Sequence, residues 1–330
     1  MIPFDYQRAT DVDSAVATLV ARPRAVFLGG GTNLVDHLKL GLLSPELLVD
    51  VSRLPFDTID ALPGGGVRIG AMVRNSDLAV HPLIRQRYPA LAQAVLAGAS
   101  GQLRNLATTG GNLLQRTRCS YFHDVTTPCN KREPGSGCSA LDGHNRDHAI
   151  LGASEHCVAT HPSDMAVALA AFDAVVQVHG PDGTRAIRLT ELHRLPGDEP
   201  HRDTLLRHGE LITAVDLPDL PIAARSTYRK VGNRASYAFA LVSVAAAVDV
   251  ADGVIYDARI ALGGLAHKPW RAACAEDQLR GAPATTDMFR AAAAAELAPA
   301  RPLAHNAFKV SMAANTLVAV LHELTTQESR

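Results

Sequence analysis

The chain has 330 residues, 47% of them apolar, and a formal net charge of −1. This length predicts roughly two or three domains, and the near-neutral charge argues against a general nucleic-acid binder. The N-terminus lacks the basic and apolar regions of a signal peptide, and the longest apolar stretches are too short to span a bilayer. We therefore expect a chain made in the cytoplasm, without a membrane span.

The first third of the chain predicts an α/β arrangement. Residues 11–21 have helical spacing behind an Asp cap, and short strands are expected at 25–28, 46–51 and 67–70. Two helices are expected next, one capped by residues 75–77 and one over 89–99. A strand, a glycine turn and a crossover to a second strand form an α/β unit.

The middle of the chain is more polar. A turn rich in Gly, Thr and Asn at 105–113 leads into a segment, 116–148, that has few apolar runs. A helix is expected from Ser163, followed by a strand at 174–178.

A domain boundary is expected near residues 216–223, because composition changes there. Beyond it we expect strands at 226–230 and 255–262. Ala-rich helices are expected at 235–248, 270–280 and 291–295, and a last helix from Ser311.

Two glycine turns are candidates for binding an anion. They are LGGGTNL at 28–34 and ATTGGNLLQ at 107–115. Consecutive glycines do not match the Rossmann fingerprint, but they let backbone amides approach an anion closely. One such turn is explained equally well by a tight strand-to-helix connection, whereas the pair suits a long diphosphate ligand such as FAD.

Four of the five cysteines lie within the polar segment or just after it. They are Cys119, Cys129, Cys138 and Cys157. A segment this polar is not expected to order itself by apolar burial, so we expect a metal or an iron–sulfur cluster to hold it. The spacing does not choose between zinc and iron–sulfur. Cys274, in an Ala-rich stretch, is expected to be a small buried hydrophobe.

Two charged residues have both a structural and a functional interpretation. Asp164 is either a helix cap or a group facing a flavin. Lys230 is either a solvated strand residue or a positive charge near a flavin ring or phosphate.

With these features in place, the chain resembles the FAD-binding medium subunits of the molybdenum hydroxylases, the family of xanthine dehydrogenase and carbon monoxide dehydrogenase. The segments that carry the resemblance are LGGGTNLVDHLKLG (28–41), LRNLATTGGNLLQ (103–115), PSDMAVAL (162–169), YRKVGNRASYAFALVSVA (228–245) and ALGGLAHKPWRA (261–272).

The resemblance implies an α+β fold of two domains. A two-part FAD-binding domain of the vanillyl-alcohol-oxidase (PCMH) type would span 1–220, with an iron–sulfur loop inserted at 116–158. A C-terminal α+β domain of the carbon monoxide dehydrogenase flavoprotein type would span 221–330. The FAD-binding residues that it implies are Leu28, Gly29, Gly30, Gly31, Thr32, Asn33, Leu34, Thr108, Gly111, Asn112, Asp164 and Lys230.

Within the family, the cysteine-containing segment is similar to that of the flavoprotein subunits of bacterial periplasmic aldehyde oxidoreductases. That similarity implies a [4Fe-4S] cluster with Cys119, Cys129, Cys138 and Cys157 as its ligands.

The function implied is electron transfer in a molybdenum-dependent aldehyde oxidoreductase. A large subunit with the molybdenum cofactor would oxidise the aldehyde, and a [2Fe-2S] small subunit would pass electrons to FAD on this chain. FAD would then reduce an external acceptor, so no catalytic side chain is expected here. Export to the periplasm would require a partner that bears a twin-arginine signal; otherwise the complex would be cytoplasmic.

Three alternatives stay open at this stage. The first is the FAD subunit of a dehydrogenase for xanthine, another purine or another aromatic substrate. The second is a stand-alone flavin oxidase, and the third is a zinc-stapled scaffold without a redox role.

Overall fold

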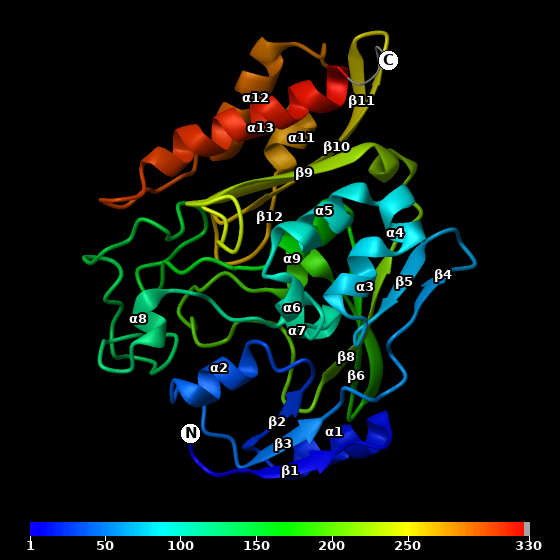
Figure 1. The fold of residues 1–330 in the computed structure, drawn as a ribbon. Coiled ribbons are helices and arrows are strands. Elements are labelled where there is room, and N and C mark those ends of the chain that lie inside the picture. The colour runs from blue at the N-terminus through cyan, green and yellow to red at the C-terminus, as the bar shows by residue number, and fades with distance from the viewer. Residues whose placement is uncertain (327–330) are drawn as a thin grey trace.

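The computed structural model describes residues 1–326, which form three sheets and the helices that pack on them (Figure 1). In Figure 1 the N-terminal sheet lies at the bottom, and the C-terminal sheet with its helices lies at the top. The mixture of helix and sheet agrees with the expected α+β class.

The N-terminal sheet is parallel, with strand order β1-β3-β2. Its strands are β1 (Asp5–Arg8), β2 (Ala25–Leu28) and β3 (Leu47–Asp50). Helix α1 (Val12–Ala21) connects the first two strands, and the Asp11 carboxylate caps it by accepting from the Ser14 backbone N–H at 2.8 Å. Helix α2 (Leu34–Lys39) follows the first glycine turn.

The middle sheet is antiparallel, with strand order β4-β5-β8-β6-β7. Its strands are β4 (Ile59–Ala61), β5 (Val67–Gly70), β6 (Val175–Gly180), β7 (Gly183–Arg188) and β8 (Leu211–Leu217). Residues from distant parts of the chain therefore meet in one sheet.

Most helices of the first 220 residues lie between the middle and C-terminal sheets or beside them. They are α3 (Asn75–Val80), α4 (Pro82–Arg87), α5 (Pro89–Ala97), α6 (Gly101–Arg104), α7 (Thr109–Leu113), α9 (Asp164–Ala171) and α10 (Leu189–Leu192). Helix α8 (Ser120–His123) lies apart from these sheets, in the cysteine-containing segment (Figure 1). Helix α9 is buried along its whole length, and it packs with α5 against the C-terminal sheet.

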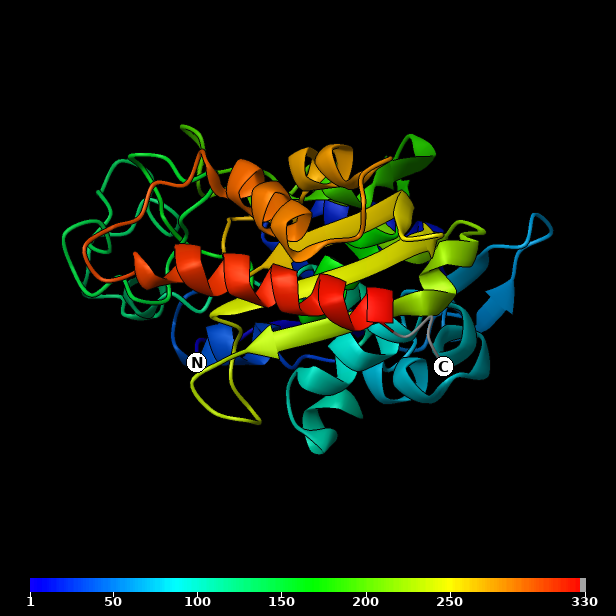
Figure 2. The ribbon, with the colours of Figure 1, turned by 90° about the horizontal axis from the view of Figure 1, so that it is seen from above.

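The C-terminal sheet is antiparallel, with strand order β12-β11-β10-β9. Its elements are a 3₁₀ turn (Pro221–Arg225), β9 (Ser226–Val231), β10 (Val242–Ala251), β11 (Val254–Gly263), β12 (Trp270–Arg271), α11 (Ala273–Leu279), α12 (Thr286–Leu297) and α13 (Phe308–Thr326). Figure 2 shows α13 lying across the outer face of this sheet with α12 beside it.

The helix expected over residues 235–248 is wrong, because Val242–Ala251 form the central strand β10. Ala245 and Ala247 face the core shared with α9, whereas Val244 and Ala246 face the core under α13. This alternation satisfies two cores at once and overrides the weak helical preference of alanine.

The other expected elements are present, with ends shifted by a few residues. Within residues 1–326, no helix combines the length and the apolar character that crossing a membrane requires.

Candidate functional site

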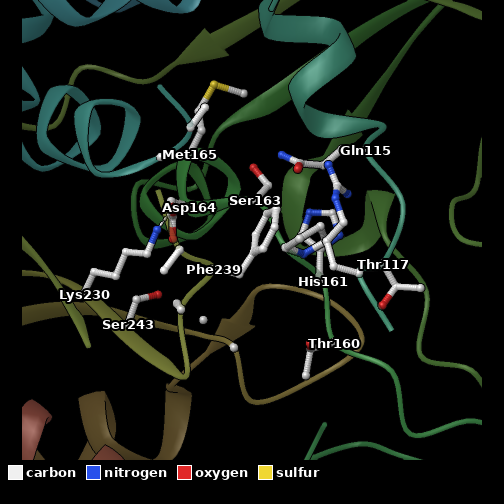
Figure 3. Close-up of a pocket in the computed structure, with 18 of the residues that line it drawn as sticks. Gln115, Thr117, Thr160, His161, Ser163, Asp164, Met165, Lys230, Phe239 and Ser243 are labelled. Carbon is white, nitrogen blue, oxygen red and sulfur yellow. Dashed lines mark hydrogen bonds and ion pairs between the residues drawn. The ribbon is translucent and has the colours of Figure 1, made fainter. Parts of the chain in front are cut away.

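A cavity of about 670 Å³ lies where the two glycine turns, the start of α9 and the C-terminal sheet come together (Figure 3). Its wall includes Thr32 and Asn33 from the first turn, Gly111 and Asn112 from the second, and Lys230 from β9. This size and the mixed polar and apolar wall are typical of a cofactor site.

The two glycine turns pack directly against each other. A Cβ atom on Gly30 would lie 2.0 Å from the carbonyl oxygen of Leu106, and one on Gly29 would lie 3.1 Å from Thr108 Oγ1. Gly31 has a φ of +73°, which favours glycine. The first turn therefore requires glycine because of its backbone angle and its close approach to the second turn.

Asparagine side chains hold the turns to neighbouring segments. Asn33 Oδ1 accepts from the backbone N–H of Arg116 at 3.0 Å. Asn112 Oδ1 accepts from Ser163 Oγ at 2.6 Å and from Gln115 Nε2 at 2.9 Å. The second turn is thus tied to the residue that caps α9.

A buried polar triad lies at the start of α9. Lys230 Nζ donates to Asp164 Oδ2 at 2.7 Å and to the Ala97 carbonyl at 3.0 Å, and the Tyr228 hydroxyl donates to Asp164 Oδ1 at 2.5 Å. Burial raises the pKa of Asp164, although Lys230 and Tyr228 oppose that rise. Ser163, rather than Asp164, caps the helix, since its hydroxyl accepts from the Ala166 N–H.

Six of the twelve predicted FAD-binding residues line the cavity. They are Thr32, Asn33, Gly111, Asn112, Asp164 and Lys230. The other six also belong to the two glycine turns, but they are not part of the cavity wall. They are Leu28, Gly29, Gly30, Gly31, Leu34 and Thr108.

Several residues of the wall were not singled out from the sequence. Asn75 at the start of α3 presents a buried Oδ1 with no hydrogen-bond partner among the described residues. Arg118 stacks over the ring of Phe239 at 4.9 Å from its centroid, and burial lowers the pKa of this guanidinium. Isolated Asn, Arg and Phe residues carry no pattern that would have indicated this role.

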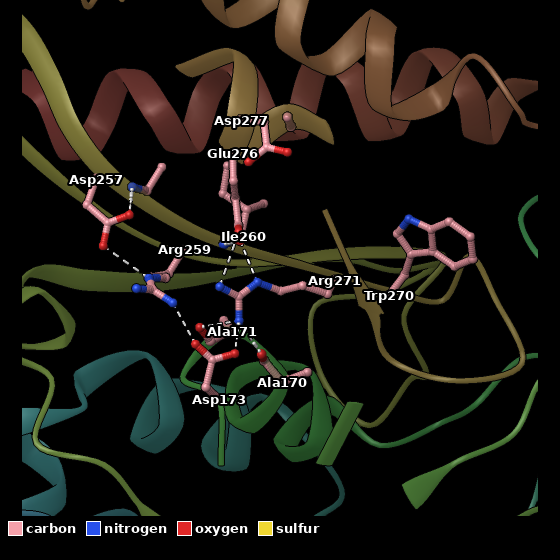
Figure 4. A network of polar contacts seen from close by, with 12 residues as sticks. Ala170, Ala171, Asp173, Asp257, Arg259, Ile260, Trp270, Arg271, Glu276 and Asp277 are labelled. Carbon is pink, nitrogen blue, oxygen red and sulfur yellow. Dashed lines mark hydrogen bonds and ion pairs between the residues drawn. The ribbon is translucent and has the colours of Figure 1, made fainter. Parts of the chain in front are cut away.

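The far end of α9 is anchored to the C-terminal sheet by an ion-pair network (Figure 4). Arg271 donates to the carbonyls of Ala170 and Ala171 at 2.8 and 3.0 Å and to Asp173 at 2.7 Å. Arg271 also pairs with Glu276 at 2.5 Å. Because both ends of α9 are bound to this sheet, the sheet fixes where Asp164 enters the cavity.

The cysteine-containing segment does not meet the expectation of a [4Fe-4S] cluster. Cys119, Cys129, Cys138 and Cys157 line a narrow cavity of about 10 Å³. Among residues 1–326, however, no group of three or more His, Cys, Asp or Glu side chains is arranged to hold a metal ion. This finding contradicts the predicted cluster and the ligand roles that depended on it.

Protein hydrogen bonds order the segment instead. Arg132 Nη1 donates to the carbonyls of Tyr121 and Phe122 at 2.9 and 2.8 Å, and Asn130 Oδ1 accepts from the N–H groups of Gly135 and Gly137. The inference that a metal must hold this loop is wrong because polar side chains of the loop form hydrogen bonds with its backbone N–H and C=O groups.

The fifth cysteine also departs from its expectation. Cys274 lies on α11 and is exposed, not buried.

Comparisons with known proteins are consistent along the whole chain. Residues 2–220 match the family described as the FAD binding domain in molybdopterin dehydrogenase, and residues 226–324 match the CO dehydrogenase flavoprotein C-terminal domain.

Individual relatives agree with these family matches. The chain is 52% identical over 329 residues to the aldehyde oxidoreductase FAD-binding subunit PaoB of Escherichia coli K12, covering 99% of this chain and 100% of the relative. It is 27% identical to the glyceraldehyde dehydrogenase medium chain of Sulfolobus acidocaldarius, covering 87% and 84%.

A solved carbon monoxide dehydrogenase from Hydrogenophaga pseudoflava aligns with a TM-score of 0.76 at 26% identity, covering 99% of both chains. These matches confirm the expected fold types and the expected resemblance. The matching families are an FAD-binding domain and a flavoprotein domain, and they offer no support for the [4Fe-4S] cluster.

Proposed function

Because the chain belongs to the family of FAD-binding subunits of molybdopterin dehydrogenases, we propose that it transfers electrons in a molybdenum-dependent aldehyde oxidoreductase. The observation that carries this proposal is the 52% identity, over essentially the full length of both chains, to a subunit of an aldehyde oxidoreductase. The identity to a xanthine dehydrogenase FAD-binding subunit is 25%, so a purine substrate is less favoured.

The large cavity is the proposed FAD site. Three observations support the fit: its volume of about 670 Å³, the glycine turn that brings backbone close to it, and the buried unpaired Oδ1 of Asn75. We assign to this site the twelve residues expected from the sequence. Six of them line the cavity wall, and the other six belong to the glycine turns beside it. Bound FAD would supply the two-electron chemistry.

The residues of this chain would bind and orient the cofactor. Thr32, Asn33 and Asn112 offer polar groups beside the backbone of the two turns, which suits a diphosphate. Lys230 would supply a positive charge, and its hydrogen bond to Asp164 holds the ammonium group in place. Asn75 Oδ1 would accept a hydrogen bond from a ligand N–H or O–H.

The proposed partners are a large subunit that carries the molybdenum cofactor and a small [2Fe-2S] subunit, together with an external electron acceptor. We assign FAD binding to residues 1–220 and the carbon monoxide dehydrogenase-like flavoprotein domain to residues 221–330.

Purification of the chain alone and with its partner subunits tests the proposal. We expect about one FAD per chain in both preparations. Aldehyde should bleach the flavin absorbance only when the partner subunits are present, and xanthine should not bleach it. A chain without flavin would overturn the proposal, and so would bleaching of the isolated chain by aldehyde, which would identify a stand-alone oxidase.

A further inference from the structure

A second, smaller cavity of about 20 Å³ lies beside the large one and is lined by three histidines, His161, His193 and His267. His161 lines both cavities, and its ring packs against that of His193 with 4.2 Å between the ring centroids. We call this space the histidine cavity.

Backbone carbonyls fix the protonation of two of these rings. His193 Nε2 lies 2.8 Å from the Leu113 carbonyl oxygen, and His267 Nδ1 lies 2.9 Å from that of Arg194. Because a carbonyl oxygen only accepts, each of these nitrogens must carry the proton. Burial lowers the pKa of both rings to about 4, so both are neutral, and His193 Nδ1 and His267 Nε2 are bare acceptors.

Both bare nitrogens are buried and lack a hydrogen-bond partner among the described residues, as does His161 Nε2. A metal ion is one partner for such nitrogens, but no three metal-binding side chains within residues 1–326 are arranged to hold one. A water molecule requires roughly 10–15 Å³ and two to four polar partners. The histidine cavity offers both.

We infer that the histidine cavity binds one water molecule, which donates to His193 Nδ1 and His267 Nε2 and accepts from His161 Nε2. Its two protons are used by the two bare nitrogens, so the third contact must come from a protonated His161 Nε2. Nδ1 of His161 is then the bare nitrogen, and it accepts a hydrogen bond from a ligand in the large cavity. This last role rests on the proposed FAD function.

Burial keeps His161 neutral. It is the largest cause that holds the pKa of this ring well below 6.5, and the cations Lys131 and Arg118 act in the same direction. A neutral ring with one protonated nitrogen is the form that this arrangement requires. His193 and His267 hold the water that accepts from His161 Nε2, so they are positioning residues for His161.

A crystal structure of the protein as purified, with or without FAD, tests the water site with a matched pair of variants. The amide oxygen of Asn replaces Nδ1 of histidine, whereas the amide nitrogen of Gln replaces Nε2. We expect the water in the wild type and in His193→Asn, and its loss in His193→Gln, which removes the acceptor but keeps the donor to Leu113. A dry cavity or a bound metal in the wild type would overturn the inference, and so would equal water occupancy in the two variants.

Titration of FAD into the apoprotein tests the acceptor role of His161. His161→Asn keeps an oxygen near the place of Nδ1 and should bind FAD within about threefold of the wild type, whereas His161→Gln should bind about tenfold more weakly. Equal affinities would overturn the acceptor role. Absence of FAD binding by the wild type would refute the proposed function instead, and the crystallographic test of the water would still stand.

Discussion

Two lysine–aspartate pairs lie at the candidate site, one in each cavity. Lys230 pairs with Asp164 at 2.7 Å in the wall of the large cavity, and Lys131 pairs with Asp203 in the wall of the histidine cavity. Each pair joins segments far apart in the sequence. The pKa of one aspartate is raised and that of the other is lowered.

The number of cations explains the difference. Burial raises the pKa of Asp164, and only Lys230 and the Tyr228 hydroxyl oppose it. Asp203 is also desolvated, but Arg116 and Lys131 together outweigh burial and lower its pKa to about 2. Asp203 is thus a fully compensated structural anion. Asp164 has one cation where Asp203 has two, and it lies in the wall of the cavity proposed for FAD, where a bound cofactor would supply a further partner.

The largest expected effect is on the Asp203 pair. Asp203→Leu would leave the ammonium of Lys131, whose side chain is 1% exposed, with only the Pro200 carbonyl as a partner. Breaking a buried pair in this way costs about 3–5 kcal/mol of unfolding free energy. Urea unfolding measures the loss. Asp198→Ala, at a side chain that is 96% exposed, is the control and should change stability by less than about 0.5 kcal/mol.

Asp164→Leu should destabilise the fold less than Asp203→Leu, but it should weaken FAD binding. Lys230 would keep its bond to the Ala97 carbonyl and the Tyr228 hydroxyl would lose its acceptor, so we expect a loss of about 1–3 kcal/mol. FAD titration should show affinity at least about tenfold weaker, because Lys230 loses the partner that directs it. Unchanged FAD affinity would mean that the pair serves the fold alone.

The stability contributions of the two aspartates should change with pH in opposite directions. The folded-state pKa of Asp203 lies below its ordinary value of 3.8, so its contribution is complete above that value and is lost as pH falls toward about 2. The advantage of wild type over Asp203→Asn should therefore shrink by about 2 kcal/mol across this range.

The pKa of Asp164 is raised, so its folded state binds a proton more tightly than its unfolded state. The wild type should then lose stability relative to Asp164→Asn as pH rises above 3.8. Denaturant midpoints of the three proteins at several pH values measure both slopes. Parallel slopes would contradict the contrast between the two pairs.

The sequence singled out Asp164 and Lys230 as separate site candidates, not as an ion pair, and it carried no signal for Lys131 or Asp203. Asp164 and Lys230 lie in segments that resemble a known family. The consecutive glycines of the turns are visible in the sequence because the backbone requires glycine at these positions. Lys131 and Asp203 are 72 residues apart in loops without regular periodicity. Only the tertiary fold brings them together.

The same limit explains two errors. The alanines of β10 predict a helix because alanine favours helices locally, whereas the alternate contacts of this strand with two cores exist only after the sheets assemble. Four cysteines close in sequence suggested a cluster, but the polar side chains that order their segment are recognised only from their hydrogen bonds. The three histidines come from segments spread over more than a hundred residues, so their convergence had no sequence signal.

The smallest expected effect concerns Tyr228, the partner that the Asp203 pair lacks. Tyr228→Phe removes a hydroxyl that donates to Asp164 Oδ1 at 2.5 Å and should cost about 1 kcal/mol in urea unfolding. Tyr256→Phe, at a residue that is 60% exposed, is the matched control and should leave stability unchanged within about 0.5 kcal/mol.

Loss of this donor should also raise the pKa of Asp164 further, because the hydroxyl stabilises the ionised carboxylate. The Asp164 part of the pH profile should therefore extend to higher pH in Tyr228→Phe, while the Asp203 part stays in place. A shift of both parts would mean that the two pairs are coupled across the site. A shift of neither would show that Lys230 alone sets the charge of Asp164.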